Sequence, residues 1–309
     1  MTQIIGKIQV EPNNYKIKFL YYNRARDAMF DAVNELYKKG YKDIYIPGYI
    51  GWSPKEGSGI FDPLEAIIGL NRHYYRMTKE LLIDKKCLDA QMKSSSILLI
   101  VNYFGFRDFS IQGIVENAHK KNCIVIEDNA HGFYTYFCKG SIDSDMTFFS
   151  LHKMFPFSTG GGLVIEKGCF DKLHDLKESM EFNPFQYNYN AIAKKRLQNY
   201  KKLLNLSDKY KLYFEPIREA EYLKKNVPQT FPILIKKGNR NRIYEIMNGS
   251  GYGVVSLYHT MIEELRNEEH NDAMWVSQRI MNLPVHQDVR EEHYELMLKK
   301  LAEACEFTD

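Results

Sequence analysis

The sequence predicts an α/β protein: a mostly parallel central sheet with helices on both faces, followed by a smaller C-terminal α+β domain. Short apolar runs alternate with helical patterns along the first part of the chain, which is typical of βαβ units. Several runs, such as Cys-Ile-Val-Ile at 123–126, are apolar without alternation, as in strands buried on both faces. The predicted strands are 44–47, 74–77, 97–103, 123–126, 146–150 and 163–166.

The segments between these strands show the periodicity of amphipathic helices. Residues 25–39 place Ala28 and Leu36 on one helical face and end at Gly40, which suits a C-cap. Residues 111–121 repeat the pattern. The alternation of these helices with the apolar runs predicts helices on both faces of the sheet.

The later part of the chain has a different organisation. It follows a basic segment, 191–204, which we expect to be a long helix, and a stretch that contains several prolines. The elements predicted there are a strand at 233–235, a helix at 240–247, a strand at 252–258 and a closing helix at 291–305. We therefore predict a large domain over 1–205 and a small domain over 206–309.

Composition excludes several classes of protein. The net charge of +3 is too small to indicate a nucleic-acid surface, and no run approaches the roughly 18 apolar residues of a membrane span. The five cysteines form no CxxC pair, so we expect reduced thiols in a cytoplasmic protein. The nine histidines include no HExxH pattern, so we expect no metal site. The 22 tyrosines and 18 phenylalanines favour large buried contacts or stacking on a planar ligand.

The first candidate for chemistry is Asp128, which follows the apolar strand 123–126. Open α/β sheets bind ligands at the carboxyl ends of their strands, so Asp128 should face a site with little water. The alternative is that Asp128 caps the next turn through its own side chain. His131 follows three residues later, and a lone histidine is often an ordinary hydrogen-bonded residue.

The second candidate is Lys153, which lies among phenylalanines and methionines after the strand at 146–150. Desolvation lowers the pKa of a lysine, and a neutral lysine is a nucleophile that forms Schiff bases. The alternative is a lysine whose ammonium group reaches water. The three glycines at 160–162 allow a close backbone approach, either to a neighbouring strand or to a ligand.

These residues together match the needs of pyridoxal phosphate (PLP). This cofactor needs a lysine for its aldehyde, a carboxylate that keeps its pyridine nitrogen protonated, and hydroxyls or backbone amides for its phosphate. Lys153, Asp128 and Ser150 supply these groups near the ends of consecutive strands. The sequence therefore predicts a PLP site.

At these positions the sequence resembles the DegT/DnrJ/EryC1/StrS family of PLP-dependent sugar aminotransferases of fold type I. The resemblance lies in Ile-Glu-Asp-Asn-Ala-His at 126–131, Ser-Leu-His-Lys at 150–153 and the Gly-Gly pair at 160–161. The segment Arg-Ala-Arg-Asp-Ala-Met at 24–29 is similar to the entry of the family's first helix. The segments at 101–106 and 283–286 are similar to its central strand and turn and to its late Leu-Pro-x-His turn.

The resemblance implies roles for three residues at the cofactor ring. Lys153 would form the Schiff base with the cofactor and then move the proton during transfer. Asp128 would pair with the pyridinium nitrogen. His131 takes the position of the residue that contacts the phenolic oxygen.

The resemblance also implies a phosphate site and a stacking partner. Ser150, with Arg24 and Ala25 at the start of the first helix, would bind the phosphate. An aromatic ring from Tyr49 or Trp52 would stack on the pyridine face, and the sequence leaves open which of the two does so.

Members of the family form homodimers with shared active sites, so the resemblance implies a homodimer. The family's loop of Asn-Tyr-Arg type, which reaches the neighbouring subunit's phosphate, reads Tyr-Asn-Tyr-Asn at 187–190 and has no arginine. The loop at 51–62 also departs from the family's usual helix, and we interpret it as a loop that faces substrate or cofactor.

The resemblance predicts an aminotransferase that passes an amino group from an amino acid such as glutamate to a keto group on a nucleotide-linked sugar or a related polyol precursor. Surface polysaccharide or secondary-metabolite biosynthesis would be its setting. One alternative is a PLP-dependent sugar dehydratase, because such family members carry histidine in place of the lysine and His152 lies beside Lys153. Another is a non-catalytic relative that binds PLP or a sugar nucleotide.

Overall fold

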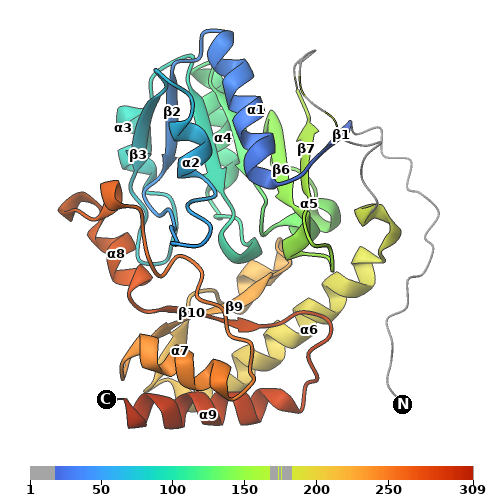
Figure 1. The fold of residues 1–309 in the computed structure, drawn as a ribbon, viewed down its shortest axis with the longest axis vertical. Helices are drawn as coiled ribbons and strands as arrows, with labels where there is room; N and C mark the ends of the chain where they lie inside the picture. The colour runs from blue at the N-terminus through green and yellow to red at the C-terminus, as the bar shows by residue number, and fades with distance from the viewer. Residues whose placement is uncertain (1–17, 168–172, 174, 176–182, 309) are drawn as a thin grey trace.

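The computed structural model describes residues 18–167, 173, 175 and 183–308 (Figure 1). Within these residues a seven-stranded sheet has the order β1-β7-β6-β5-β4-β2-β3. The pairs β2–β3, β2–β4, β4–β5 and β5–β6 are parallel, whereas β7 is antiparallel to both β6 and β1. Its strands are β1 (Phe19–Tyr22), β2 (Asp43–Pro47), β3 (Asn71–Tyr75), β4 (Ile97–Val101), β5 (Ile124–Asp128), β6 (Met146–Ser150) and β7 (Gly161–Ile165).

The predicted α/β class with a mostly parallel sheet is confirmed, and each of the six predicted strands overlaps an observed one. The strand predicted at 74–77 begins earlier, at Asn71. Its first residues are polar and more exposed, so they lack the apolar pattern by which the other strands were predicted. The strand β1, which pairs with β7 at the edge of the sheet, was not predicted from the sequence.

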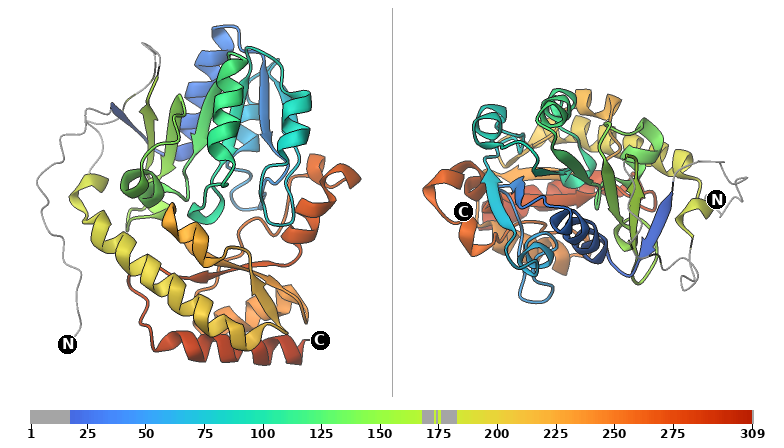
Figure 2. Two further views of the ribbon diagram at one scale, coloured as in Figure 1. Left: turned by 180° about the vertical axis from the view of Figure 1, so that it is seen from behind. Right: turned by 90° about the horizontal axis from the view of Figure 1, so that it is seen from above.

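Helices cover both faces of this sheet, and Figure 2 shows α1 and α4 on opposite sides of it. The helix α1 buries Ala28, Ala32 and Leu36, as its periodicity predicts. The helices of this part are α1 (Ala25–Lys38), α2 (Phe61–Glu65), α3 (Lys85–Gln91), α4 (Ile111–Lys120) and α5 (Phe133–Lys139), with 3-10 turns η1 (Tyr103–Gly105) and η2 (Leu151–Lys153).

The later part of the chain lies below the large sheet in Figure 1 and contains a three-stranded antiparallel sheet of order β10-β9-β8. The long helix α6 packs against α5 of the first part and against α9. The elements are α6 (Tyr189–Ser207), β8 (Phe214–Pro216), β9 (Thr230–Ile235), α7 (Arg240–Gly249), α8 (Asn271–Ser277), β10 (Ile280–Pro284) and α9 (His293–Phe307). The domain boundary predicted after residue 205 falls in the last turn of α6, and it stays a prediction.

One predicted element is wrong. Residues 252–258 do not form a strand; only Val255 makes an isolated bridge, to Asn282. The backbone takes left-handed φ values of 59° at Gly253 and 61° at Tyr258, and these interrupt an extended conformation. None of the helices in the described part of the chain is long and apolar enough to cross a membrane.

Candidate active site

The carboxyl ends of β5 and β6 open onto a cavity of about 590 Å³. Because these strands are parallel neighbours, Asp128 at the end of β5 and Ser150 at the end of β6 reach the same edge of the sheet. The turn η2 then brings Lys153 into the cavity wall. The predicted site residues that line the cavity are Arg24, Ala25, Trp52, Asp128, His131, Ser150 and Lys153.

Asp128 is a buried carboxyl group with only 4% of its surface exposed. Burial raises its pKa to about 6, although the charge of Lys153 and a 2.7 Å hydrogen bond from the Ala130 amide oppose this. The Ala130 bond is the turn-capping contact that the sequence left open as an alternative. A carboxylate in this environment is stabilised by a cation held against it.

His131 and Lys153 form the closest contact between titratable side chains in the cavity wall. The Nε2 atom of His131 lies 3.2 Å from Nζ of Lys153, and the Phe104 amide donates to Nδ1 of His131 at 3.3 Å. Since Nδ1 accepts a hydrogen bond, the proton of the neutral imidazole resides on Nε2 and is donated to the lysine. In this tautomer the contact is a hydrogen bond when Lys153 is the neutral amine, because only then can Nζ accept.

The electrostatics agree with this assignment. Burial lowers the pKa of His131 well below its ordinary value, and the charge of Lys153 lowers it further. The Lys153 side chain is exposed where it faces the cavity, and its partial desolvation lowers its pKa, while the charges of Asp128 and Glu56 oppose the change. A lysine with a lowered pKa is a better nucleophile and base near neutral pH.

The N-terminus of α1 forms another wall of the cavity. The first amides of a helix have no intrahelical partner, and the helix dipole favours an anion there. The Arg24 side chain pairs with Asp27 at 3.1 Å, and both Arg24 and Ala25 line the cavity at this helix end. Ser150 adds a hydroxyl, whose Oγ lies 3.3 Å from Nδ1 of His152.

The glycines that follow Lys153 fit this helix end against the sheet. A Cβ on Gly161 would lie 2.4 Å from the carbonyl carbon of Arg24 and 2.6 Å from the Ala25 nitrogen. A Cβ on Gly162 would collide with the ring of Phe19. Of the two roles left open by the sequence, Gly161 and Gly162 therefore serve close packing of β7 on α1 and β1.

The two candidate stacking residues lie in different places. Tyr49 is fully buried, its hydroxyl has no hydrogen-bond partner among the residues that the structure describes, and it is not part of the cavity lining. Trp52 lines the cavity and is 41% exposed. Tyr258, from the later part of the chain, also lines the cavity and lies 5.3 Å from Tyr49 between ring centroids.

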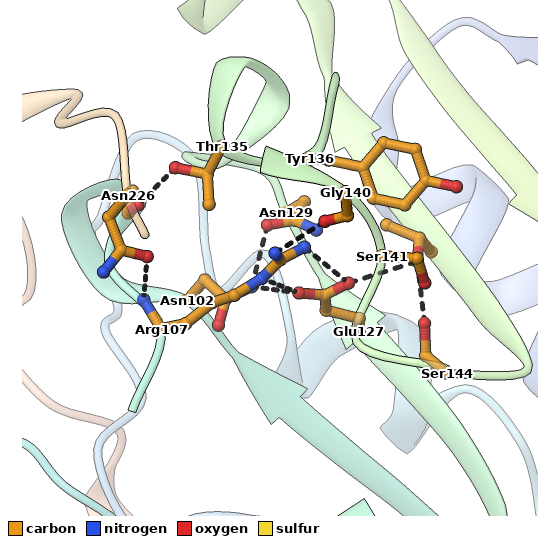
Figure 3. A network of polar contacts seen from close by, with 12 residues as sticks. Asn102, Arg107, Glu127, Asn129, Thr135, Tyr136, Gly140, Ser141, Ser144 and Asn226 are labelled. Carbon is orange, nitrogen blue, oxygen red and sulfur yellow. Dashed lines mark hydrogen bonds and ion pairs between the residues drawn. The ribbon is translucent and has the colours of Figure 1, made fainter. Parts of the chain in front are cut away.

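A buried polar network lies beneath the site (Figure 3). Glu127, the residue before Asp128 on β5, is fully buried. Its carboxylate forms an ion pair with Arg107, with 2.8 Å between Oε1 and the arginine Nε. The side-chain nitrogen of Asn102, Nδ2, donates to the Glu127 carboxylate at 2.6 Å and to the side-chain oxygen of Asn129 at 2.8 Å. These bonds join the loops after β4 and β5, and thereby fix the strand end that carries Asp128.

The same network reaches the later part of the chain. The Arg107 guanidinium donates to the Gly140 carbonyl at 2.7 Å. The backbone amide of Arg107 donates to Asn226 Oδ1 at 2.9 Å. The Thr135 hydroxyl and the backbone of Val227 also exchange hydrogen bonds. The segment that enters β9 is thus attached to the turns around the site.

The loop after β4 meets this segment at Gly105, whose φ is +89°. A Cβ there would lie 2.7 Å from the Val227 carbonyl oxygen and 3.0 Å from the carbonyl oxygen of His131. Phe104, whose amide orients His131, also has a left-handed φ of 60°. Three segments that are distant in sequence therefore converge at one point beside His131.

Sequence reasoning missed Asn102, Arg107 and Tyr258. An isolated arginine or asparagine in a loop carries no signal of its buried partner 20 or more residues away. Tyr258 was assigned to a strand, so nothing indicated that it faces the cavity. Within the described ranges of the chain, no group of three or more His, Cys, Asp or Glu side chains is arranged to hold a metal ion.

No protein-family model and no curated protein matches the sequence. Several solved structures do resemble the fold. PseC of Helicobacter pylori, described as an aminotransferase of pseudoaminic acid biosynthesis, is 14% identical with a TM-score of 0.70, over 94% of this chain and 87% of its own. The sugar aminotransferase Spr1654 of Streptococcus pneumoniae, described as putative and solved in a PMP form, is 12% identical with a TM-score of 0.72, over 94% and 88% of the two chains.

A dehydratase is similar to the same degree. The GDP-4-keto-6-deoxy-D-mannose-3-dehydratase of Escherichia coli, solved with bound hydrated PLP, is 16% identical with a TM-score of 0.69, over 93% of this chain and 87% of its own. At these identities the likeness is one of fold. It confirms the predicted fold class, fold type I of the PLP-dependent transferases.

Proposed function

We propose that this chain is a PLP-dependent aminotransferase that moves an amino group from an amino acid such as glutamate to a keto group of a nucleotide-linked sugar or related polyol precursor. The observation that carries the proposal is the contact between Lys153 and His131 in the cavity that Asp128 also lines. The solved aminotransferases that share the fold support it.

The residues of the cavity fit PLP. Asp128 is a buried carboxyl group that forms no ion pair with another residue of the described ranges, and a pyridinium nitrogen would supply a cation to it. The helix end at Ala25 and the hydroxyl of Ser150 suit a phosphate. Lys153 supplies an amine, and its pKa is lowered. When bound, PLP supplies an aldehyde for the amine and an electron sink for the carbon that loses a proton.

Each residue then has a defined task. Asp128 holds a positive charge at the ring nitrogen, His131 orients Lys153 through its Nε2 proton, and Lys153 Nζ accepts and returns the proton of the substrate carbon. Over a full cycle the donor amino acid becomes its 2-oxo acid and the keto sugar becomes an amino sugar. No outside oxidant or reductant is consumed.

The presence of Lys153 favours amino transfer over sugar dehydration. A dehydratase of this fold is among the similar structures, and His152 lies next to Lys153. His152 lines the same cavity and contacts Ser150, and Lys153, which such dehydratases replace with histidine, is present and contacts His131. Nitrogen-15 glutamate distinguishes the two reactions, since only amino transfer leaves the label on the sugar product.

The test is the absorbance spectrum of the purified protein with PLP, before and after glutamate and after borohydride, followed by peptide mass analysis. We expect a visible band that glutamate bleaches, and a pyridoxyl group on Lys153 after reduction. Lys153→Ala should lose the band and turnover. A wild-type protein that binds no PLP would overturn the proposal.

We extend the proposal to a cytoplasmic homodimer. Its basis is the resemblance of the sequence to a family whose active sites lie between two subunits. Light scattering of the PLP-loaded protein measures the oligomeric state, and a fully active monomer would contradict the dimer.

A further inference from the structure

Tyr258 is brought to the cavity by contact between two loops that lie far apart in the sequence. The Trp52 amide donates to the Thr260 carbonyl at 2.9 Å, and the Ile262 amide donates to the Ile50 carbonyl at 3.1 Å. Gly51 and Met261 form an antiparallel bridge between these bonds. The loop after β2 therefore holds the loop that carries Tyr258 in a fixed register.

Gly51 provides the space for the Tyr258 ring. A Cβ on Gly51 would lie 2.8 Å from Cδ1 and 3.3 Å from Cα of Tyr258. Any side chain at position 51 would displace Tyr258. The glycine in the loop after β2 therefore leaves the space that the Tyr258 ring fills.

Aromatic neighbours hold the ring in one orientation. Its centroid lies 5.2 Å from that of Tyr103, 5.3 Å from Tyr49 and 5.9 Å from His131. Tyr49 and Tyr103 are fully buried, whereas Tyr258 itself also lines the cavity. The buried rings thus pack behind Tyr258, which is the one of these three tyrosines that lines the cavity.

The backbone at Tyr258 is strained. Its φ of 61° lies in the left-handed region, which costs a non-glycine residue free energy. Such strain persists where the surrounding contacts overdetermine the conformation, and it is concentrated at functional sites. Here the two loop hydrogen bonds and three ring contacts supply that constraint.

The other aromatic candidates have less suitable positions. Tyr49 does not line the cavity. Trp52 lies in the loop at its rim and is 41% exposed. Phe148 lines the cavity but is only 2% exposed, so little of its ring is accessible.

Resting on the PLP site proposed above, we infer that Tyr258, contributed by the later part of the chain, is the aromatic side chain on which the planar ring of the cofactor packs, in place of Tyr49 or Trp52. Aromatic packing of this kind strengthens binding without a hydrogen bond. The C-terminal part of the chain thereby completes the cofactor site of the first part.

The test compares PLP affinity of Tyr258→Phe, Tyr258→Leu and Trp52→Leu by titrating the cofactor-free protein and following the visible absorbance and its induced circular dichroism. We expect Tyr258→Phe to bind as the wild type does, Tyr258→Leu to bind about tenfold more weakly, and Trp52→Leu to lose less. The matched control is Phe109→Leu, because Phe109 also contacts a tyrosine ring, that of Tyr222 at 4.0 Å between centroids, but lies outside the cavity.

Tyr258→Gly guards against a folding artefact, since glycine accepts the left-handed backbone without strain. A folded Tyr258→Gly with weak PLP binding supports the inference. Wild-type affinity and circular dichroism in Tyr258→Leu or Tyr258→Gly would overturn the role of Tyr258 while the PLP site stands. If the wild type binds no PLP, the proposed function fails, and this inference fails with it.

Discussion

The imidazole of His131 is held between the Phe104 amide, which donates to Nδ1, and Lys153, which lies 3.2 Å from Nε2. The direction of the first bond leaves Nε2 as the ring nitrogen that carries the proton, and burial lowers the pKa of both bases. A backbone turn after β4 therefore orients His131 and, through it, contacts Lys153.

This relationship predicts the acid sensitivity of the fold. The pKa of His131 is far below 6.5 in the folded state, so below pH 6.5 the unfolded chain binds a proton that the folded chain does not. The unfolding free energy should fall as the pH drops, by up to about 1.4 kcal/mol per pH unit from this residue. Urea titrations between pH 5 and 8 should show a shallower decline for His131→Gln, which accepts the Phe104 bond and does not titrate. Parallel profiles would contradict the assignment.

Asp128 should change the unfolding free energy with pH in the opposite direction. Its pKa rises from 3.8 to about 6 on folding, so the folded protein binds the proton more tightly and loses stability as the pH rises through that interval. The difference corresponds to roughly 3 kcal/mol. We expect Asp128→Asn to stabilise the cofactor-free protein at pH 7.5 by up to about this amount, and to have little effect near pH 4.

The control for this prediction is Asp208→Asn, which removes an exposed carboxylate paired with Lys211. It should change the unfolding free energy by less than about 0.5 kcal/mol at either pH. A destabilised Asp128→Asn at pH 7.5 would show that the carboxylate is stabilised in the folded protein without a ligand.

The part of the site that could be predicted consists of polar residues directly after apolar strands. Asp128 and Ser150 end β5 and β6, and Lys153 follows at once, so local sequence and the parallel pairing of the strands place them together. The helix start at Ala25 was also visible, because the periodicity of α1 is regular.

The rest depends on contacts between distant segments. Tyr258 reaches the cavity only because the loops at 50–52 and 260–262 pair, and its left-handed backbone makes a strand-like sequence fold as a turn. The helix α5 was missed because Phe-Tyr-Thr-Tyr-Phe is as suitable for a strand as for a helix. The ion pair between Arg107 and Glu127 could not be predicted, because it depends on the pairing of β4 with β5.

The ion pair of Arg107 and Glu127 should be costly to break. Both side chains are more than 90% buried, and the carboxylate also accepts the amide of Asn102. Arg107→Met leaves a buried negative charge, which we expect to lower the unfolding free energy by about 3 to 5 kcal/mol. Glu295→Gln, which breaks an exposed pair with Lys209, should cost less than about 1 kcal/mol in the same denaturant titration. An equal, small cost for both would show that the buried pair contributes little.

A pair of glycines tests the convergence of segments beside His131. Gly105→Ala places a Cβ 2.7 Å from the Val227 carbonyl oxygen at a φ of +89°, so we expect a loss of at least about 2 kcal/mol. Gly113→Ala, inside α4 with only the end of Lys85 at 3.7 Å, should raise the unfolding free energy by about 0.5 to 1 kcal/mol.

Hydrogen exchange adds a local measurement, because the Gln229 amide donates to the Phe104 carbonyl at 2.8 Å. Faster exchange at Gln229 in Gly105→Ala, with unchanged exchange in Gly113→Ala, would show that this contact attaches the later part of the chain to the turn that orients His131. Unchanged exchange in both variants would mean that the two parts are held together elsewhere.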